Sequence, residues 1–82
     1  MYKGVTFKQL QKTLSGFGFI ESQAEDNNVL FRHTTTGVVL TVPNSGTVRP
    51  IYVSSAARQL SNSGIATISK FESQLEKAAR NG

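Results

Sequence analysis

Apolar residues recur every three or four positions near the start of the chain, at Phe7, Leu10, Leu14 and Phe17. This spacing gathers them on one side of a helix, and the residues between them are mainly polar. Thr6 and Gln9 form a T-x-x-Q capping box, in which each side chain accepts a backbone N–H of the first turn. The pattern predicts a helix that begins at Phe7 and ends at Gly18 in a left-handed cap, with Gly16 as the alternative end.

Three short runs after this helix have the composition of strands, and they cover residues 19–24, 29–33 and 38–42. Polar segments rich in turn-forming residues separate one run from the next. Pro43 cannot donate a hydrogen bond to a strand ladder, so it ends the third run. The pattern therefore predicts a three-stranded antiparallel sheet.

Helical spacing returns in the second half of the chain. Val53, Ala56, Ala57 and Leu60 predict a second helix over residues 52–62, and Gly64 follows it in the place of a left-handed cap.

A further helix is predicted over residues 66–80. It begins at Thr67, or at a capping box of Ser69 and Glu72, and its buried stripe is expected to be Ile68, Phe71 and Leu75. No linker or repeat interrupts the chain. We therefore interpret residues 1–82 as one α+β domain of order α-β-β-β-α, with residues 66–80 as an additional C-terminal helix.

Composition narrows the chemistry that this domain can perform. A chain of 82 residues buries only about 60% of its unfolded surface, which favours a groove or an open sheet face over a deep pocket. Cys 0 and His 1 exclude a disulfide, a thiol nucleophile and a zinc–thiolate site. We expect no metal and no small-molecule cofactor, and the acidic residues Glu21, Glu25 and Asp26 indicate a solvated turn.

Charge and hydropathy bear on partners and location. Nine Lys and Arg against five Asp and Glu give a net charge of +4, which favours encounter with polyanions such as nucleic acid. No apolar run approaches the roughly 20 residues needed to cross a bilayer. We expect a small basic cytoplasmic protein with no membrane contact.

The basic residues that we consider for nucleic-acid contact are dispersed: Lys8, Lys12, Arg32, Arg49 and Arg58. Such a set suits double-stranded RNA, which proteins contact mainly through its shape and backbone. The alternative for the two lysines of the first helix is an ordinary solvated helix face.

The basic residues of the last helix and the aromatic residues are interpreted from their positions in the predicted elements. Lys70, Lys77 and Arg80 interleave with acidic residues and indicate i,i+4 support of the last helix. All five phenylalanines take core-type positions, so Tyr2 and Tyr52 are the candidates for base stacking.

Several segments of the chain carry a family resemblance. Residues 14–21 (LSGFGFIE) combine a helix end with a Gly-Phe strand entry, and residues 31–33 (FRH), Gly37 and residues 40–43 (LTVP) follow in the next two strands. Together with residues 60–65 (LSNSGI), they resemble the HicA family, small toxins of bacterial and archaeal toxin–antitoxin pairs. The resemblance implies a double-stranded-RNA-binding-like fold, cleavage of messenger RNA, and a HicB-like antitoxin as protein partner.

The chain departs from this family at the residue that performs the chemistry. The family's Gly-Ser-His or Gly-Gly-His at the start of the second strand corresponds here to Asp26, Asn27 and Asn28. An amide does not titrate near neutral pH, so Asn28 cannot act as a general base. His33 is the one imidazole of the chain and matches the family's second, non-catalytic His.

The sequence therefore predicts a HicA-like domain that binds RNA or a partner protein and is catalytically inactive. Two alternatives stay open at this point. One is an active HicA-type mRNA interferase that uses His33 or another mechanism, and the other is a protein-interaction module without nucleic-acid binding.

Overall fold

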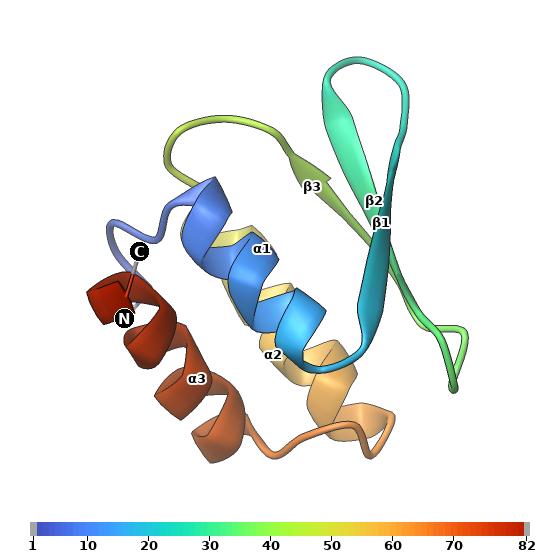
Figure 1. Cartoon of the computed structure of the whole chain (residues 1–82), viewed down its shortest axis with the longest axis vertical. Helices are drawn as coiled ribbons and strands as arrows, with labels where there is room; N and C mark the ends of the chain where they lie inside the picture. Colours follow the sequence, from blue (N-terminus) through green and yellow to red (C-terminus); the bar gives the residue numbers. More distant parts are fainter. Residues whose placement is uncertain (1, 82) are drawn as a thin grey trace.

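The structure, a computed structural model, describes residues 2–81; Met1 and Gly82, which complete the predicted domain, lie outside this range. The elements along the chain are α1 (Phe7–Gly16), β1 (Phe19–Gln23), β2 (Asn28–His33), β3 (Val39–Pro43), α2 (Pro50–Asn62) and α3 (Ile68–Asn81). Figure 1 shows them in space. The α+β class and the predicted order of one helix, three strands and two helices are confirmed.

The three strands form one antiparallel sheet of order β1-β2-β3. Phe31 at the centre of β2 lies opposite Glu21 on β1 and Leu40 on β3. The helices α1 and α2 cover one face of this sheet, and the other, outer face is open (Figure 1). On the outer face Ile20 is 56% exposed and Val39 is 48% exposed.

The capping box at the start of α1 is confirmed. The Gln9 N–H donates to the Thr6 hydroxyl at 3.0 Å, and the Thr6 N–H donates to the Gln9 side chain at 3.3 Å. The helix ends at Gly16, the alternative end, with Phe17 as its C-cap. Gly18 adopts a left-handed φ of +95° and turns the chain into β1.

The helix α2 begins at Pro50, two residues before the predicted start at position 52. Proline is favoured in the first turn because its fixed φ matches the helix and its missing N–H would have had no partner. The predicted left-handed residue after this helix is confirmed, since Gly64 has a φ of +73°.

The start of α3 is set by Thr67, whose hydroxyl accepts the Lys70 N–H at 3.1 Å. The alternative cap, Ser69 with Glu72, is not used, and Glu72 instead accepts a hydrogen bond from the Tyr2 hydroxyl at 2.7 Å. The expectation that Ile68 is buried is wrong, because it is 45% exposed at the first position of the helix. The buried stripe consists of Phe71, Leu75 and Ala78.

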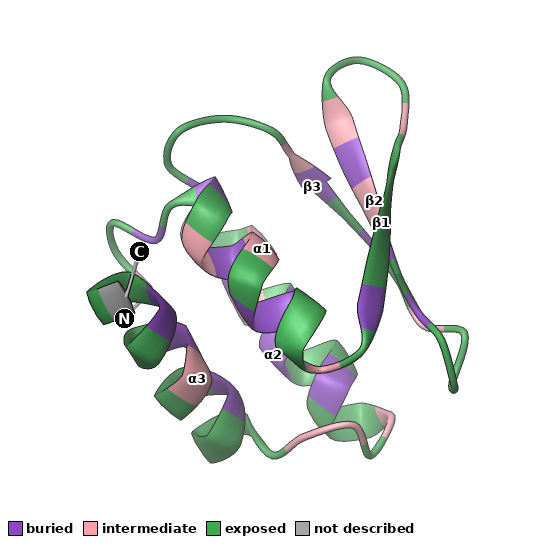
Figure 2. Cartoon of the chain, in the orientation of Figure 1, coloured by how far each residue is buried: buried purple, intermediate pink, exposed green. Residues whose placement is uncertain are grey.

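The helix α3 is part of the hydrophobic core, although the resemblance makes it an addition to the fold. The helices α1 and α2 lie between α3 and the sheet (Figure 1). Phe71 is fully buried in the same cluster as Phe31 and Leu10, and the buried sides of the helices face one another in Figure 2. The Gln9 side chain also donates to the Leu75 carbonyl at 2.9 Å, which ties α1 directly to α3.

Candidate nucleic-acid interface

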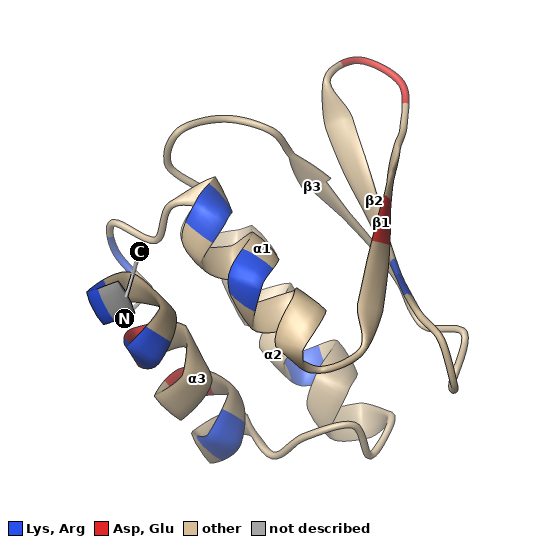
Figure 3. Cartoon of the chain, in the orientation of Figure 1, with Lys and Arg blue, Asp and Glu red and all other residues tan. Residues whose placement is uncertain are grey.

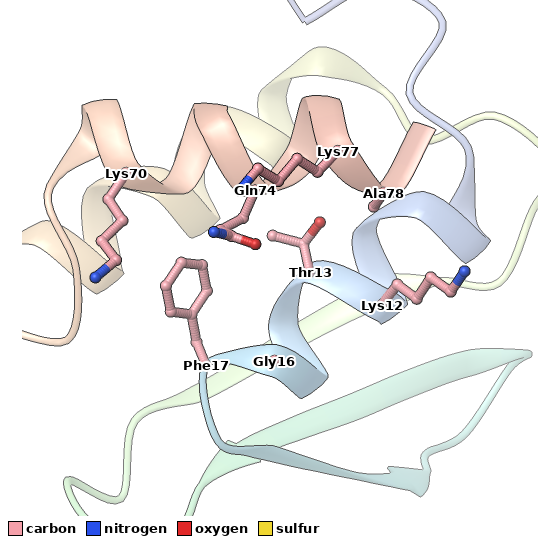
Figure 4. A pocket seen from close by; sticks show the side chains of 8 residues that line it. All are labelled: Lys12, Thr13, Gly16, Phe17, Lys70, Gln74, Lys77 and Ala78. Carbon is pink, nitrogen blue, oxygen red and sulfur yellow. The ribbon is translucent and has the colours of Figure 1, made fainter. Parts of the chain in front are cut away.

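A shallow groove of about 450 Å³ lies between α1 and α3. Its lining includes Lys12, Thr13 and Phe17 on one side and Lys70, Gln74 and Lys77 on the other. Figure 4 shows these side chains, with Lys70 beside the Phe17 ring and Lys12 at the opposite end of the groove. The groove owes its existence to the packing of α3 on α1, which sequence patterns do not specify.

A second, larger hollow of about 1080 Å³ surrounds the beginning of α1. Lys8 and the loop residues 44–46 line it, and it shares Lys12 and Ala78 with the first groove. The two hollows are therefore neighbours on the surface of α1 and α3. We call the four lysines that border them, Lys8, Lys12, Lys70 and Lys77, the lysine track; Figure 3 shows the basic residues of α1 and α3 on one side of the molecule.

No acidic side chain lines either hollow within residues 2–81. Three carboxylates on or beside these helices have partners: Glu76 pairs with Arg80 at 2.8 Å, Glu72 accepts from the Tyr2 hydroxyl at 2.7 Å, and Glu21 accepts at 2.6 Å from Gln11, a residue of the second hollow. Further acidic residues lie at the β1–β2 turn, remote from the helices (Figure 3). The charged side chains in the described lining of the two hollows are therefore all lysines.

Sequence reasoning missed the contribution of α3 to this surface. The expected i,i+4 support is formed by Arg80 with Glu76, whereas Lys70 and Lys77 pair with no carboxylate that the structure describes. The signal that identifies them is their spacing, since steps of four and three place Lys70, Gln74 and Lys77 on one side of a helix. That side faces α1.

The other predicted basic residues lie apart from the track. Arg32 is exposed on the outer face of the sheet, whereas α1 covers the inner face. Arg49 is the N-cap residue of α2, Arg58 lies on that helix, and both are exposed. Of the five candidates, the structure brings Lys8 and Lys12 together and places neither Arg32, Arg49 nor Arg58 in the lining of the hollows.

His33 has a structural role at the turn between β2 and β3. Its Nδ1 accepts the Thr36 N–H at 3.1 Å, so the ring proton belongs on Nε2, which donates to the Phe17 carbonyl at 2.9 Å. His33 is 9% exposed, and the centroid of its ring lies 5.0 Å from the centroid of the Phe19 ring. Both nitrogens are thus engaged in holding the turn against the end of α1, as expected for a strand-end histidine.

Asn28, at the family's catalytic position, is the first residue of β2 and lies opposite Pro43. Burial alternates along this strand, with Val29 and Phe31 on the inner face. Asn28 therefore shares the outer face with Arg32. Asn28 is not among the residues that line either hollow.

The aromatic side chains are arranged differently from the sequence expectation. Phe17 packs against the core cluster but is only half-buried, and its ring also forms one wall of the groove (Figure 4), so the assignment of all five phenylalanines to the core holds only in part for Phe17. Tyr2, a candidate for base stacking, already has partners within the fold: its ring packs edge-on against Phe71, and its hydroxyl donates to Glu72. Burial, and next the hydrogen bond to Glu72, raise the pKa of Tyr2 to about 12.

Among residues 2–81, no three His, Asp or Glu side chains gather in a way that could hold a metal ion, and no helix in that range is long and apolar enough to span a membrane. Comparison with known proteins gave no relative: no family model, curated protein or solved structure matches the chain.

Proposed function

We propose that this protein is a cytoplasmic RNA-binding domain of the HicA-like, double-stranded-RNA-binding type that lacks the family's hydrolytic group. The observation that carries the proposal is the lysine track, in which Lys8, Lys12, Lys70 and Lys77 border two neighbouring hollows whose described lining has no acidic side chain. A phosphodiester backbone is the ligand that such a surface fits best.

The arrangement of the lysines favours RNA recognised by its backbone. Lysine ammonium groups act as point charges for phosphates, and contacts of this kind fix the position of a nucleic acid without reading its sequence. Structured RNA is bound largely in this way. The open shape of the hollows, which spread over two helices, is suited to a polymer.

The site also supports binding without cleavage. Asn28 has no group that titrates near neutral pH, and it lines neither of the hollows that the track borders. His33 could serve as a general base only after giving up its hydrogen bonds to Phe17 and Thr36. These observations weigh against the alternative of an active mRNA interferase.

The test is to incubate the purified protein with a labelled RNA hairpin and to measure both retention and strand cleavage. We expect saturable retention of intact RNA, weakened in Lys12→Gln, with Arg58→Gln as a control of equal charge change outside the track. Metal-independent cleavage that disappears in His33→Ala would overturn the assignment as inactive. Absence of retention at low salt would overturn the RNA-binding function.

The Asn28→His variant also tests the inactive assignment, because it places an imidazole at the family's catalytic position. Because Asn28 lines neither hollow, we expect this variant to bind RNA as the wild type does and to leave it uncut. Nuclease activity gained by this single change would mean that RNA reaches the outer sheet face, against the proposed site.

Protein binding at the outer sheet face is the second candidate function. It is favoured by Ile20 and Val39, which are 56% and 48% exposed and lie on either side of Arg32. A HicB-like protein encoded beside this chain is the partner to examine. Co-purification that is abolished by Val39→Asp and kept in Thr35→Asp, on an exposed turn, would support this role; equal retention in both would contradict it.

A further inference from the structure

We infer that the groove between α1 and α3 holds one unpaired RNA nucleotide, with its base against the ring of Phe17 and its flanking phosphates at Lys70 and Lys77. This inference rests on the proposed function, because it assumes that the lysine track binds RNA. It adds a specific requirement: the bound RNA must contain a base that is not stacked within a duplex.

The first argument is the rigidity with which Phe17 is held at the groove. It is the C-cap of α1, and its N–H donates to the Leu14 carbonyl at 3.0 Å. Its own carbonyl accepts from His33 at 2.9 Å. The ring is half-buried and stands in the groove next to Lys70 (Figure 4), so an aromatic surface is in place before any ligand arrives.

The second argument concerns Gln74, whose half-buried side-chain amide points into the groove near the Phe17 ring (Figure 4). Among the residues that the structure describes, this amide makes no hydrogen bond. An amide carries both a carbonyl acceptor and an NH₂ donor, and these are the groups that pair with the edge of a base. Gln74 is therefore placed to contact a base that lies on Phe17.

The third argument is that a positive charge lies on each side of Gln74 along α3. Lys70 and Lys77 are exposed, and they flank Gln74 along α3. With a rise of about 1.5 Å per residue, their backbones are about 10 Å apart along the helix. A nucleotide within a strand has a phosphate on both sides of its sugar, so the two ammonium groups can meet both phosphates of one residue.

The size of the groove fits a single nucleotide unit. Its volume of about 450 Å³ lies within the range of roughly 300–1,000 Å³ that small-ligand sites have. Bases within a duplex are stacked on each other and cannot lie flat on a side-chain ring. Loops and bulges expose bases that stack on aromatic side chains, and we therefore assign the groove to an unpaired nucleotide.

The experiment compares two hairpins of identical stem, one with a single bulged nucleotide and one fully paired, by fluorescence anisotropy. Both are closed by a non-nucleotide linker in place of the loop, so the paired hairpin exposes no unpaired base. We expect the wild type to prefer the bulged RNA, and Phe17→Leu, which keeps an apolar side chain, to lose between about 5-fold and 150-fold in affinity for it. Its affinity for the paired hairpin should be unchanged. Tyr52→Leu, which removes a ring outside the groove, is the matched control and should keep the preference.

Gln74→Ala provides an independent readout, since a polar residue at the groove can be replaced without removing core packing. It should reduce the preference for the bulged RNA as well, and circular dichroism establishes that each variant is folded. Equal affinity of the wild type for the two hairpins, or an unchanged preference in both Phe17→Leu and Gln74→Ala, overturns the inference while RNA binding stands. Failure of both hairpins to bind overturns the proposed function itself.

Discussion

His33 donates from Nε2 to the main-chain carbonyl of Phe17 at 2.9 Å, which joins the end of β2 to the end of α1. The same ring accepts the Thr36 N–H through Nδ1. The single imidazole of the chain therefore fixes the residue whose side chain forms the wall of the groove. The role of His33 in the structure is therefore positional, through the backbone of Phe17.

Replacing His33 should destabilise the fold. His33→Ala leaves the Phe17 carbonyl and the Thr36 N–H without these partners and opens space beside Phe19, with an expected loss of about 2–4 kcal/mol. Urea unfolding followed by circular dichroism measures it. Thr35→Ala, on the exposed turn, is the control and should change stability by less than about 0.5 kcal/mol; an equally small effect of His33→Ala would contradict the structural role.

Gly18 should not tolerate a side chain. Its φ is +95°, and a Cβ there would lie 3.3 Å from the His33 Nε2 atom, so Gly18→Ala is expected to lower the free energy of unfolding by more than about 1 kcal/mol. Gly16 is the matched control, since it ends α1 and a Cβ there meets no atom within 4 Å. Gly16→Ala should be neutral or stabilising by up to about 1 kcal/mol; the reverse order would refute the geometry.

Gln9 combines two roles that a pair of substitutions can separate. Its side-chain oxygen accepts the Thr6 N–H, and its NH₂ group donates to the Leu75 carbonyl. Gln9→Glu keeps the cap and loses the donor, and we expect it to cost about 1 kcal/mol. Gln9→Ala loses both and should cost about 1–2 kcal/mol. Thermal unfolding measures the difference, and equal stability of Gln9→Glu and wild type would exclude a role for the α1–α3 hydrogen bond.

Tyr2 predicts a stability change at high pH. Its pKa is raised from 10.0 to about 12, so the folded state favours the neutral phenol. The resulting stabilisation is present below pH 10 and is lost as the pH rises from 10 towards 12. Ultraviolet titration of tyrosinate in wild type and Tyr2→Phe checks this, because the variant should lack the late transition; a Tyr2 transition at the ordinary pKa would contradict the contact with Glu72.

The sequence predicted correctly those features of the fold that depend on residues close together in the chain. The Thr6–Gln9 capping box, the strand end at Pro43 and the left-handed Gly64 depend on neighbouring residues and are present in the structure. The apolar spacing that predicts α2 begins only at Val53, whereas the helix starts at Pro50, because the first turn of a helix accepts proline.

The candidate site was harder to predict because it depends on how α3 packs against α1. Gln9 and Leu75 are 66 positions apart in sequence, and no periodicity within either helix says that they meet. Lys70 and Lys77 were therefore assigned to local ion pairs, and Phe17 to the core. Both assignments follow from considering each helix alone, and both change once the groove between the two helices is known.

The most direct test of the lysine track is the dependence of RNA affinity on salt concentration. It is measured for two double variants, Lys70→Gln/Lys77→Gln and Arg49→Gln/Arg58→Gln, and each is compared with the wild type. The two double variants lose the same charge, but only the first loses lysines that line the groove. Each phosphate contact contributes about 0.7–0.9 to the slope of log K against log salt concentration. We predict that the slope becomes shallower by about 1.4–1.8 in the lysine variant and stays near the wild-type value in the arginine variant. Equal changes in the two variants would mean that overall charge, and not the track, binds RNA.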